Sequence, residues 1–391
     1  MTGLVPLLET LGSSNIHDKE KAKNNWTATL KSLSPEALKS QIVEIEEKIL
    51  KILEAERWQD REGGIFAITQ VLCYLDLAAK ENAEFKAEFF KRLKTLVKDK
   101  EYTIRVAVGE CLKTLMEKYG PKIYGELQEV IEKTTEEAFV KEEVKDTLNK
   151  ESRWQHLKSM LMMIKGCAEA SKLEFLPYVN DKLVSLIEKA VKCESTFVRN
   201  LGISVITALL ACLDEKALTN LSPRFVPLIW DGMNNDFSYI KHEGSLAARV
   251  FFTLIESNQE LKKIYYPKLL PTIGLNRHYD LESISLIAKD IWENTIKGSN
   301  REWVINYLKN FVEYYLEQTK SEDDQVREAS YKSIEELFTH TEVISKEKLK
   351  EFAKDILKIL INGMEDKAWE AKTKANSAVK QLLLVIPLIK Q

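Results

Sequence analysis

Apolar residues recur along this chain in short helical groups that return at an interval of about 44 residues. In each group, the third, seventh and tenth residues after an opening position are usually apolar or small, as Gly64, Ile68 and Val71 are after Arg61. An α-helix turns once in 3.6 residues, so these offsets lie on one helical face. Eight such groups follow one another, and they predict eight copies of one helical unit.

The opening position is usually basic, and this fixes the register of the repeat. The basic opening residues are Arg61, Arg105, Arg199, Lys241, Arg327 and Lys372. Trp154, which follows Arg153, opens the third group, and Leu281 opens the sixth. A second register for the third group aligns Trp154 with Trp58 and moves its opening position to Leu157. Both registers keep an apolar helical face, so both remain open.

One helix pair cannot cover its own apolar face, and it must stack on the next pair. The groups therefore predict an all-α protein, a right-handed α-solenoid of about eight helix pairs in one continuous domain over residues 34–391. Residues 1–33 are predicted to form N-terminal capping helices. The predicted helix pairs span residues 35–80, 83–119, 121–170, 173–213, 217–258, 260–297, 300–340 and 345–388.

Proline, glycine and serine mark the predicted helix ends. Ser34-Pro35 is typical of a helix start, and Gly120-Pro121 is typical of a stop followed by a new start. Pro177 is expected early in the first helix of the fourth pair, and Ser222-Pro223 is expected to open the fifth pair. The first segment of the third pair, residues 123–148, is rich in Glu and Lys and is expected to bend or project from the stack.

Two segments carry an Asp near the turn and a basic residue that opens the second helix, namely Asp99 to Ala107 and Asp324 to Ala329. A third segment, Phe197 to Gly202, carries the Val-Arg opening without the Asp. In this pattern the chain resembles HEAT repeats, from about residue 35 to its end. The resemblance implies stacked antiparallel helix pairs, although the basic residue is missing or displaced in two of them. An Arg and an Asp from a neighbouring turn can form a charge-assisted link, so a structural role is expected first for the basic positions.

Aromatic residues lie in the turns just before the basic positions. They are Trp58, Tyr102, Phe197, Tyr239, Tyr279 and Trp369, with Trp154 at an opening position. The turns of a solenoid align along one edge, and aromatic rings beside Arg and Lys are typical of interaction hot spots. Alternatively, each ring packs within its own turn. The candidate partner-binding residues are Trp58, Arg61, Tyr102, Arg105, Trp154, Phe197, Arg199, Tyr239, Lys241 and Trp369.

Residues 58–63 also resemble a stretch found in larger HEAT families, namely the tubulin-binding TOG domains and ribosome-associated HEAT scaffolds. This short match implies tubulin or the ribosome as possible partners. The chain ends in an apolar stretch, residues 381–391, that is expected either to fold back on the last helix pair or to contact another chain.

Composition narrows the function further. The net charge of −3 disfavours general nucleic-acid binding, which needs a strong positive field. The five cysteines lack CxxC spacing, and neither a signal peptide nor a membrane-length apolar segment is evident, so a cytoplasmic location and no membrane contact are expected.

Motifs for chemistry are absent from the sequence. The five histidines are scattered, and no HExxH, phosphate-binding glycine loop or GxSxG motif is present. We therefore predict no catalytic, cofactor or metal site, and a non-enzymatic scaffold or adaptor that presents a concave surface and an aromatic, basic turn edge to partner proteins. A TOG-like or ribosome-associated module is the alternative, and a HEAT-like enzyme that modifies nucleic acid is a remote one.

Overall fold

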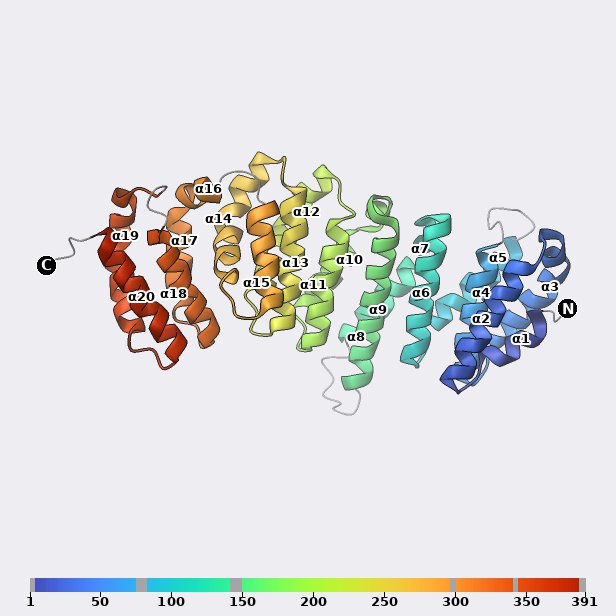
Figure 1. Ribbon diagram of the computed structural model, residues 1–391. Coiled ribbons are helices and arrows are strands. Elements are labelled where there is room, and N and C mark those ends of the chain that lie inside the picture. Colours follow the sequence, from blue (N-terminus) through green and yellow to red (C-terminus); the bar gives the residue numbers. More distant parts are fainter. Residues whose placement is uncertain (1–3, 75–82, 141–149, 296–299, 340–343, 387–391) are drawn as a thin grey trace. The chain divides into compact units, whose positions relative to one another are not determined.

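A computed structural model describes residues 4–74, 83–140, 150–295, 300–339 and 344–386 (Figure 1). Within these ranges the chain is all-α and contains no strand, which confirms the predicted fold class. None of the helices in these ranges combines the length and apolarity needed to cross a lipid bilayer. The chain divides into two compact units, residues 1–214 and residues 215–391.

The first unit begins with α1 (Leu4–Leu11) and α2 (Ile16–Ser32), and four helix pairs follow. The pairs are α3 (Pro35–Ile52) with α4 (Trp58–Leu72), α5 (Ala83–Leu96) with α6 (Tyr102–Tyr119), α7 (Lys122–Gly125) and α8 (Gln128–Val140) with α9 (Lys150–Ser171), and α10 (Asp181–Val191) with α11 (Thr196–Leu210). A 3₁₀ segment, η3 (Lys172–Tyr178), precedes α10.

The second unit contains the other four pairs. They are α12 (Glu215–Met233) with α13 (Ser238–Leu254), α14 (Gln259–Asn276) with α15 (Glu282–Asp290) and the π-helical turn η4 (Ile291–Thr295), α16 (Asn300–Asn306) and α17 (Leu308–Gln318) with α18 (Asp324–Thr339), and α19 (Lys346–Gly363) with α20 (Trp369–Val385). Each predicted opening position lies at or near the start of a second helix, as the repeat predicts, and both registers of the third group place that position in α9.

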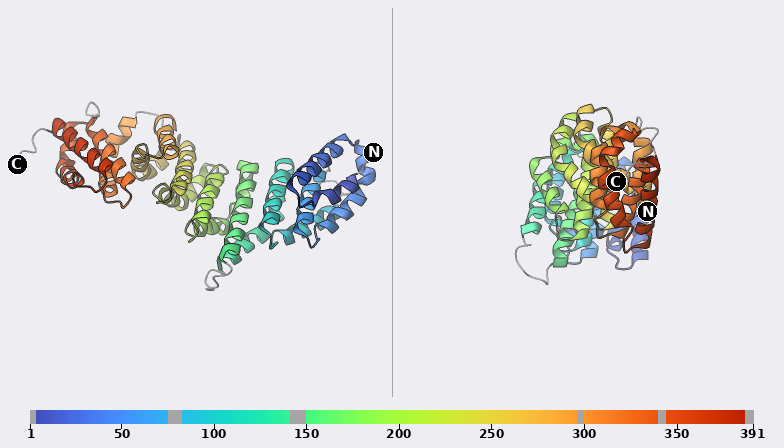
Figure 2. Two further views of the ribbon diagram at one scale, coloured as in Figure 1. Left: turned by 60° about the horizontal axis from the view of Figure 1, so that its bottom comes forward. Right: turned by 90° about the vertical axis from the view of Figure 1, so that its left-hand side faces the viewer.

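Successive helix pairs are neighbours in space within each unit (Figure 2). The second helices α4, α6, α9 and α11 form one row in the first unit, and α18 packs on α20 in the second (Figure 1). The apolar positions of these rows are buried, for example Ile68, Leu112 and Ile164. The core of each unit therefore runs along the stack between its first and second helices.

Three glycines allow the second helix to approach the first helix of its own pair. They are Gly64, Gly202 and Gly244, each three residues after an opening position. A Cβ atom on Gly244 would lie 2.5 Å from the carbonyl carbon of Gly232 and from the amide nitrogen of Met233. Backbone atoms cannot yield as a flexible side chain can, so this position requires glycine.

Two predicted helix boundaries were wrong. Pro177 lies in η3 and not in an α-helix, because the 3₁₀ turn completes the link before α10 begins. Ser222-Pro223 does not open the fifth pair but lies inside α12, where Leu218, Phe225 and Ile229 are buried on both sides of the proline. The burial of this continuous apolar face outweighs the backbone hydrogen bond that proline removes.

The first segment of the third pair bends, as expected, because it is split into α7 and α8. Residues 141–149, which complete the charged part of this segment, lie outside the described ranges. Gly120 ends α6 with a φ of 80°, a left-handed conformation that favours glycine, so the predicted stop is confirmed.

We predict that Gly244→Ala lowers the free energy of unfolding of the second unit by about 2 kcal/mol or more, because its Cβ meets backbone atoms. Gly166→Ala in α9 is the matched control. A Cβ there would lie 3.8 Å from Lys113 Cδ, an ordinary contact. The control should be neutral or should stabilise the chain by up to about 1 kcal/mol, since alanine favours helix. Urea unfolding followed by circular dichroism measures both, and equal losses would contradict the packing argument.

Candidate protein-interaction surface

Arg61, which opens α4, links its own turn to the next helix pair. Its Nη1 donates hydrogen bonds to the backbone carbonyls of Ala55 and Glu56, both at 2.8 Å. Its Nε and Nη2 donate to the two carboxylate oxygens of Asp99 at 2.9 and 3.0 Å. Asp99 lies in the turn before α6, so a buried, bidentate, charge-assisted contact ties the first pair to the second.

Arg327 repeats this arrangement in the second unit. It donates to the carbonyls of Ser321 and Glu322 at 2.9 Å and to the carboxylate of Asp366 at 2.8 and 2.9 Å. The same carboxylate accepts the backbone N–H of Ala368 at 2.9 Å, which fixes the turn before α20. The hydrogen bond from Arg327 lowers the pKa of Asp366. The predicted Arg–Asp link between repeats is therefore confirmed at these two positions.

Arg105 occupies the same position in α6 but has no carboxylate in hydrogen-bonding contact. Its Nη1 donates to the carbonyls of Asp99 and Lys100 at 2.6 and 3.1 Å, and its Nε donates to Ser159 Oγ of α9 at 2.8 Å. Its Nη2 has no hydrogen-bond partner among the described residues. The side chain is fully buried, and burial lowers the pKa of its guanidinium. Arg105 thus ties α6 to α9 but leaves its positive charge only partly compensated.

Tyr279 replaces the missing basic residue at the sixth position, where Leu281 stands. Its hydroxyl donates to Asp323 Oδ2 at 2.9 Å, and its ring lies 4.1 Å below the ammonium of Lys241. Lys241 is itself only 3% exposed, and burial lowers its pKa while Asp323 opposes that shift. A Lys–Tyr–Asp chain of contacts therefore links repeats that lack the Arg–Asp pair.

These contacts agree with the structural role that was expected first for the basic positions. Arg61, Arg105 and Lys241 are buried and face the neighbouring repeat. Arg199 is half-buried and donates to the carbonyls of Cys193 and Glu194 at 2.9 and 3.0 Å, in the manner of Arg61. A partner-binding role for these four residues stays a prediction.

The aromatic candidates differ widely in exposure. Phe197 at the start of α11 is 73% exposed, and Trp369 at the start of α20 is 72% exposed. Tyr239 is partly exposed, and its ring centroid lies 5.9 Å from that of Phe237, an exposed neighbour that the sequence analysis did not select. Tyr279 is buried. Only some turns therefore present an aromatic ring to solvent.

Trp58 is partly covered by α2. Lys19 of α2 forms an ion pair with Glu62 and also lies 5.6 Å from the Trp58 ring. Lys23, one turn further along α2, lies 5.3 Å from the ring of Phe66. Trp58, Glu62 and Phe66 are four residues apart on one face of α4, so α2 lies along the outward side of that helix (Figure 1).

Tyr102 and Trp154 are half-buried in the next two repeats. The Tyr102 hydroxyl lies 3.5 Å from Met162 Sδ, and Lys158 Nζ lies 5.5 Å from the Tyr102 ring. The indole nitrogen of Trp154 is buried and has no hydrogen-bond partner among the described residues. Tyr102, Lys158 and Met162 thus form a small aromatic and cationic cluster across α6 and α9.

Contacts between second helices favour Leu157 as the third opening position. In the second unit, Arg249 and Asp290 approach to 3.6 Å and lie eight and nine residues after positions 241 and 281. In the first unit, Lys113 lies eight residues after position 105, and its Cδ lies 3.8 Å from where a Cβ on Gly166 would stand, nine residues after Leu157. This register aligns Trp154, Lys158 and Met162 of α9 with Trp58, Glu62 and Phe66 of α4.

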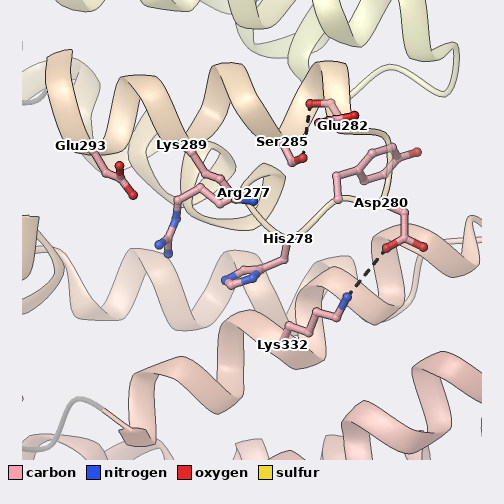
Figure 3. A pocket seen from close by; sticks show the side chains of 9 residues that line it. Arg277, His278, Asp280, Glu282, Ser285, Lys289, Glu293 and Lys332 are labelled. Atoms are coloured by element: carbon pink, nitrogen blue, oxygen red, sulfur yellow. Dashed lines mark hydrogen bonds and ion pairs between the residues drawn. The ribbon is translucent and has the colours of Figure 1, made fainter.

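A hollow of about 540 Å³ opens between α15 and α18 (Figure 3). Among neighbouring second helices of the same unit, these two pack least closely on each other. Arg277 and His278 lie at its wall. Arg277 stacks on Trp292 at 4.2 Å and donates two bonds to Glu336 at 3.2 and 2.6 Å, while His278 Nε2 lies 3.0 Å from the same carboxylate. The lining residues are Arg277, His278, Tyr279, Asp280, Glu282, Ser285, Lys289, Glu293 and Lys332.

Within the described ranges, no three His, Cys, Asp or Glu side chains are arranged to hold a metal ion. Four of the five cysteines are buried, and Cys73 is partly exposed. Burial raises the pKa of the Cys111 thiol to about 12, so this group stays a neutral core residue at physiological pH.

We predict that Glu336 makes the second unit acid-sensitive. Burial alone would raise its pKa, but hydrogen bonds and charge from His278 and Arg277 hold the pKa at about 2, below the ordinary 4.5. A depressed pKa stabilises the fold above about pH 4.5, and this contribution is lost as the pH falls toward 2. Between pH 5 and 3, the chain should lose about 2 kcal/mol more unfolding free energy than Glu336→Gln does. Urea unfolding at both pH values measures these losses. The control is Glu313→Gln, which removes the carboxylate of an exposed ion pair and should behave as the unmodified chain does. Equal losses of unfolding free energy in the unmodified chain and both variants would contradict the prediction.

No family model matches the sequence, and the comparison with curated proteins finds no match. Solved structures do match. The karyopherin Kap121p bound to the SUMO protease Ulp1p is 11% identical over 97% of this chain and 37% of that chain, with a TM-score of 0.52. Kap121p bound to RanGTP is 12% identical over 97% of this chain and 38% of that chain, with a TM-score of 0.51. This chain spans less than two fifths of those proteins, and it shares with them the HEAT/armadillo-like α-solenoid fold.

Proposed function

We propose that this chain is a non-enzymatic protein-binding scaffold that presents the aromatic turns and the outward second-helix faces of its repeats to partner proteins. The observation that carries this proposal is the exposure of Phe197 and Trp369, beside opening residues that are buried or half-buried. Exposed rings on a rigid helical frame are suited to bury apolar area in a partner at little entropic cost.

The turn before α11 supports the proposal. Arg199 donates to the backbone carbonyls of Cys193 and Glu194 and so fixes this turn. Phe197, two residues earlier, then projects from a backbone that cannot easily rearrange. A preorganised ring of this kind loses little freedom when a partner binds.

The shared fold also supports this class of function. The solved Kap121p structures are complexes with RanGTP and with Ulp1p, so this solenoid architecture serves protein recognition in another protein. At 11 and 12% identity, the likeness concerns the fold, and the partners of Kap121p are not transferred to this chain.

An enzyme acting on nucleic acid is the less favoured function. It needs a basic cleft around a catalytic carboxylate, whereas the hollow beside α15 is lined by Asp280, Glu282 and Glu293 as well as by basic residues. Tubulin and the ribosome remain predicted partners that no contact in the described residues favours. A cytoplasmic location and the 1–33 cap also remain predictions.

The C-terminal contact with another chain stays a proposal as well. Val385 and Ile386 are buried, which is consistent with partial fold-back of the apolar end. Leu383 and Leu384 are exposed and could bury area in a second chain. Residues 387–391 lie outside the described ranges.

We predict that combining Phe197→Ala, Phe237→Ala and Trp369→Ala reduces partner capture at least tenfold while each unit keeps its unfolding free energy within about 0.5 kcal/mol, because the rings are exposed. Partners are first identified by affinity capture on the unmodified chain and mass spectrometry, and their binding is then measured.

The matched control removes three exposed apolar side chains that lie away from these turns, with Leu173→Ala, Ile264→Ala and Ile361→Ala. It should bind partners as the unmodified chain does. The proposal is wrong if the aromatic variant keeps full binding, or if both variants lose binding equally.

A further inference from the structure

We infer that the outward face of α9, together with Tyr102 of α6, binds an acidic amphipathic helix of a partner protein, laid along α9 as α2 lies along α4. The inference rests on the proposed function and names the chemistry of one partner. It comes from the contact between α2 and α4, which shows how a helix covers this face of a repeat.

The contact between α2 and α4 combines one ion pair with two lysine-aromatic contacts. Lys19 pairs with Glu62 and lies over the Trp58 ring, and Lys23 lies over the Phe66 ring. The row on α4 that faces these lysines is an aromatic, an acidic and an aromatic residue. Beside the lysines on α2, Ala22, Trp26 and Leu30 form a buried helical stripe, and α2 packs on both α1 and α4.

The equivalent row on α9 also places a charged residue between two apolar ones, but the charge is opposite and a methionine takes the place of the second aromatic ring. Trp154 stands for Trp58, Lys158 stands for Glu62, and Met162 stands for Phe66. Lys158 is exposed, and Met162 is 37% exposed. α6 packs beside α9 and borders this row through Tyr102, which contacts Lys158 and Met162. On the outward side of the row, no described helix takes the place that α2 takes on α4. A helix that docks here in the same way must carry a carboxylate where α2 carries Lys19.

The charges beneath and beside the row favour an acidic partner. Asp99 is already paired with Arg61, so the fully buried guanidinium of Arg105 has no carboxylate of its own. That guanidinium lies 5.9 Å from the Tyr102 ring, and Lys158 lies 5.5 Å from the same ring. Neither cation has a carboxylate hydrogen-bond partner or ion pair among the described residues. Lys158 is the exposed cation that a partner carboxylate can reach, whereas Arg105 is buried and Asp99 and Glu101 offset part of its charge. The attraction between Lys158 and a carboxylate is strongest where a docked helix excludes water.

The apolar part of the spot suits a helix that inserts one side chain. Met162 Sδ already contacts the Tyr102 hydroxyl, and a methionine beside an aromatic ring adapts its shape to an incoming group. A helix that docks in this way makes its contacts through residues three and four apart on one of its faces. The spacing of Ala22, Trp26 and Leu30 in α2 is a template for that face.

The test uses two peptides of residues 14–33, each with a hydrocarbon staple that replaces the exposed Asn24 and Ala28 and keeps the peptide helical. One carries Lys19→Glu and Lys23→Glu, and the other keeps both lysines. Binding to the full chain is followed by NMR of ¹³C-labelled methionine methyl groups. Met162 reports on the site, and the buried Met233 is a reference.

The acidic peptide should shift the Met162 signal saturably, with a Kd of about 100 μM or tighter, and should leave Met233 unchanged. The lysine peptide should bind at least tenfold more weakly. Lys158→Glu, at an exposed position, should reverse the preference between the peptides. Ile264→Glu, an exposed substitution in the second unit, should leave the preference unchanged.

The inference is overturned if neither peptide shifts Met162, or if Lys158→Glu leaves the preference unchanged. A Met162 shift that depends on chain concentration without peptide would instead identify a second copy of this chain as the occupant, and would also overturn it. If the aromatic turn variant loses partner capture while the peptides fail, the proposed function stands and only this inference fails.

Discussion

An inward-facing Arg at the start of a second helix, bonded to the carboxylate of the next turn, sets the geometry of two junctions in the stack, and other junctions are variations on it. One guanidinium satisfies two carbonyls of its own turn and two oxygens of the next repeat, as Arg61 and Arg327 show. The bond therefore fixes the turn, the spacing of adjacent pairs and the register of their apolar faces together. Apolar burial drives the stacking, but it has no direction, and these charged contacts set the geometry.

The distinctive features of the surface lie where this contact changes. At Arg105 the carboxylate is replaced by the hydroxyl of Ser159, and a positive charge remains beneath Tyr102. At Leu281 the guanidinium is missing, Tyr279 bonds Asp323 instead, and the second helices beyond it separate around a charged hollow. The irregular repeats thus provide exposed or partly compensated charged groups that the regular repeats lack. The regular repeats on either side fix the positions of those groups.

Much of the fold could be predicted, because the third, seventh and tenth positions of eight helices repeat one packing solution, and an error in a single copy does not disturb the others. The candidate surface was harder, because the sequence does not show what covers a residue. Trp58 and Trp369 occupy the same place in their repeats, yet α2 lies over the first and the second is exposed. Lys241 reads as a surface charge, but its burial depends on Tyr279 from the next turn, a contact that local pattern does not reveal. Pro223 likewise signalled a helix start, whereas long-range burial carries α12 through it.

The central claim, that the inward-facing Arg–carboxylate contact holds consecutive repeats together, is tested most directly by a double-mutant cycle on Arg327 and Asp366. Arg327→Met, Asp366→Asn and the double variant are unfolded in urea at pH 7, with the exposed pair Lys263 and Glu260 as the reference cycle. The account predicts a coupling energy of about 1.5 kcal/mol or more for the half-buried, bidentate pair and about 0.5 kcal/mol or less for the exposed pair. A coupling for Arg327 and Asp366 no larger than that of the exposed pair would contradict it.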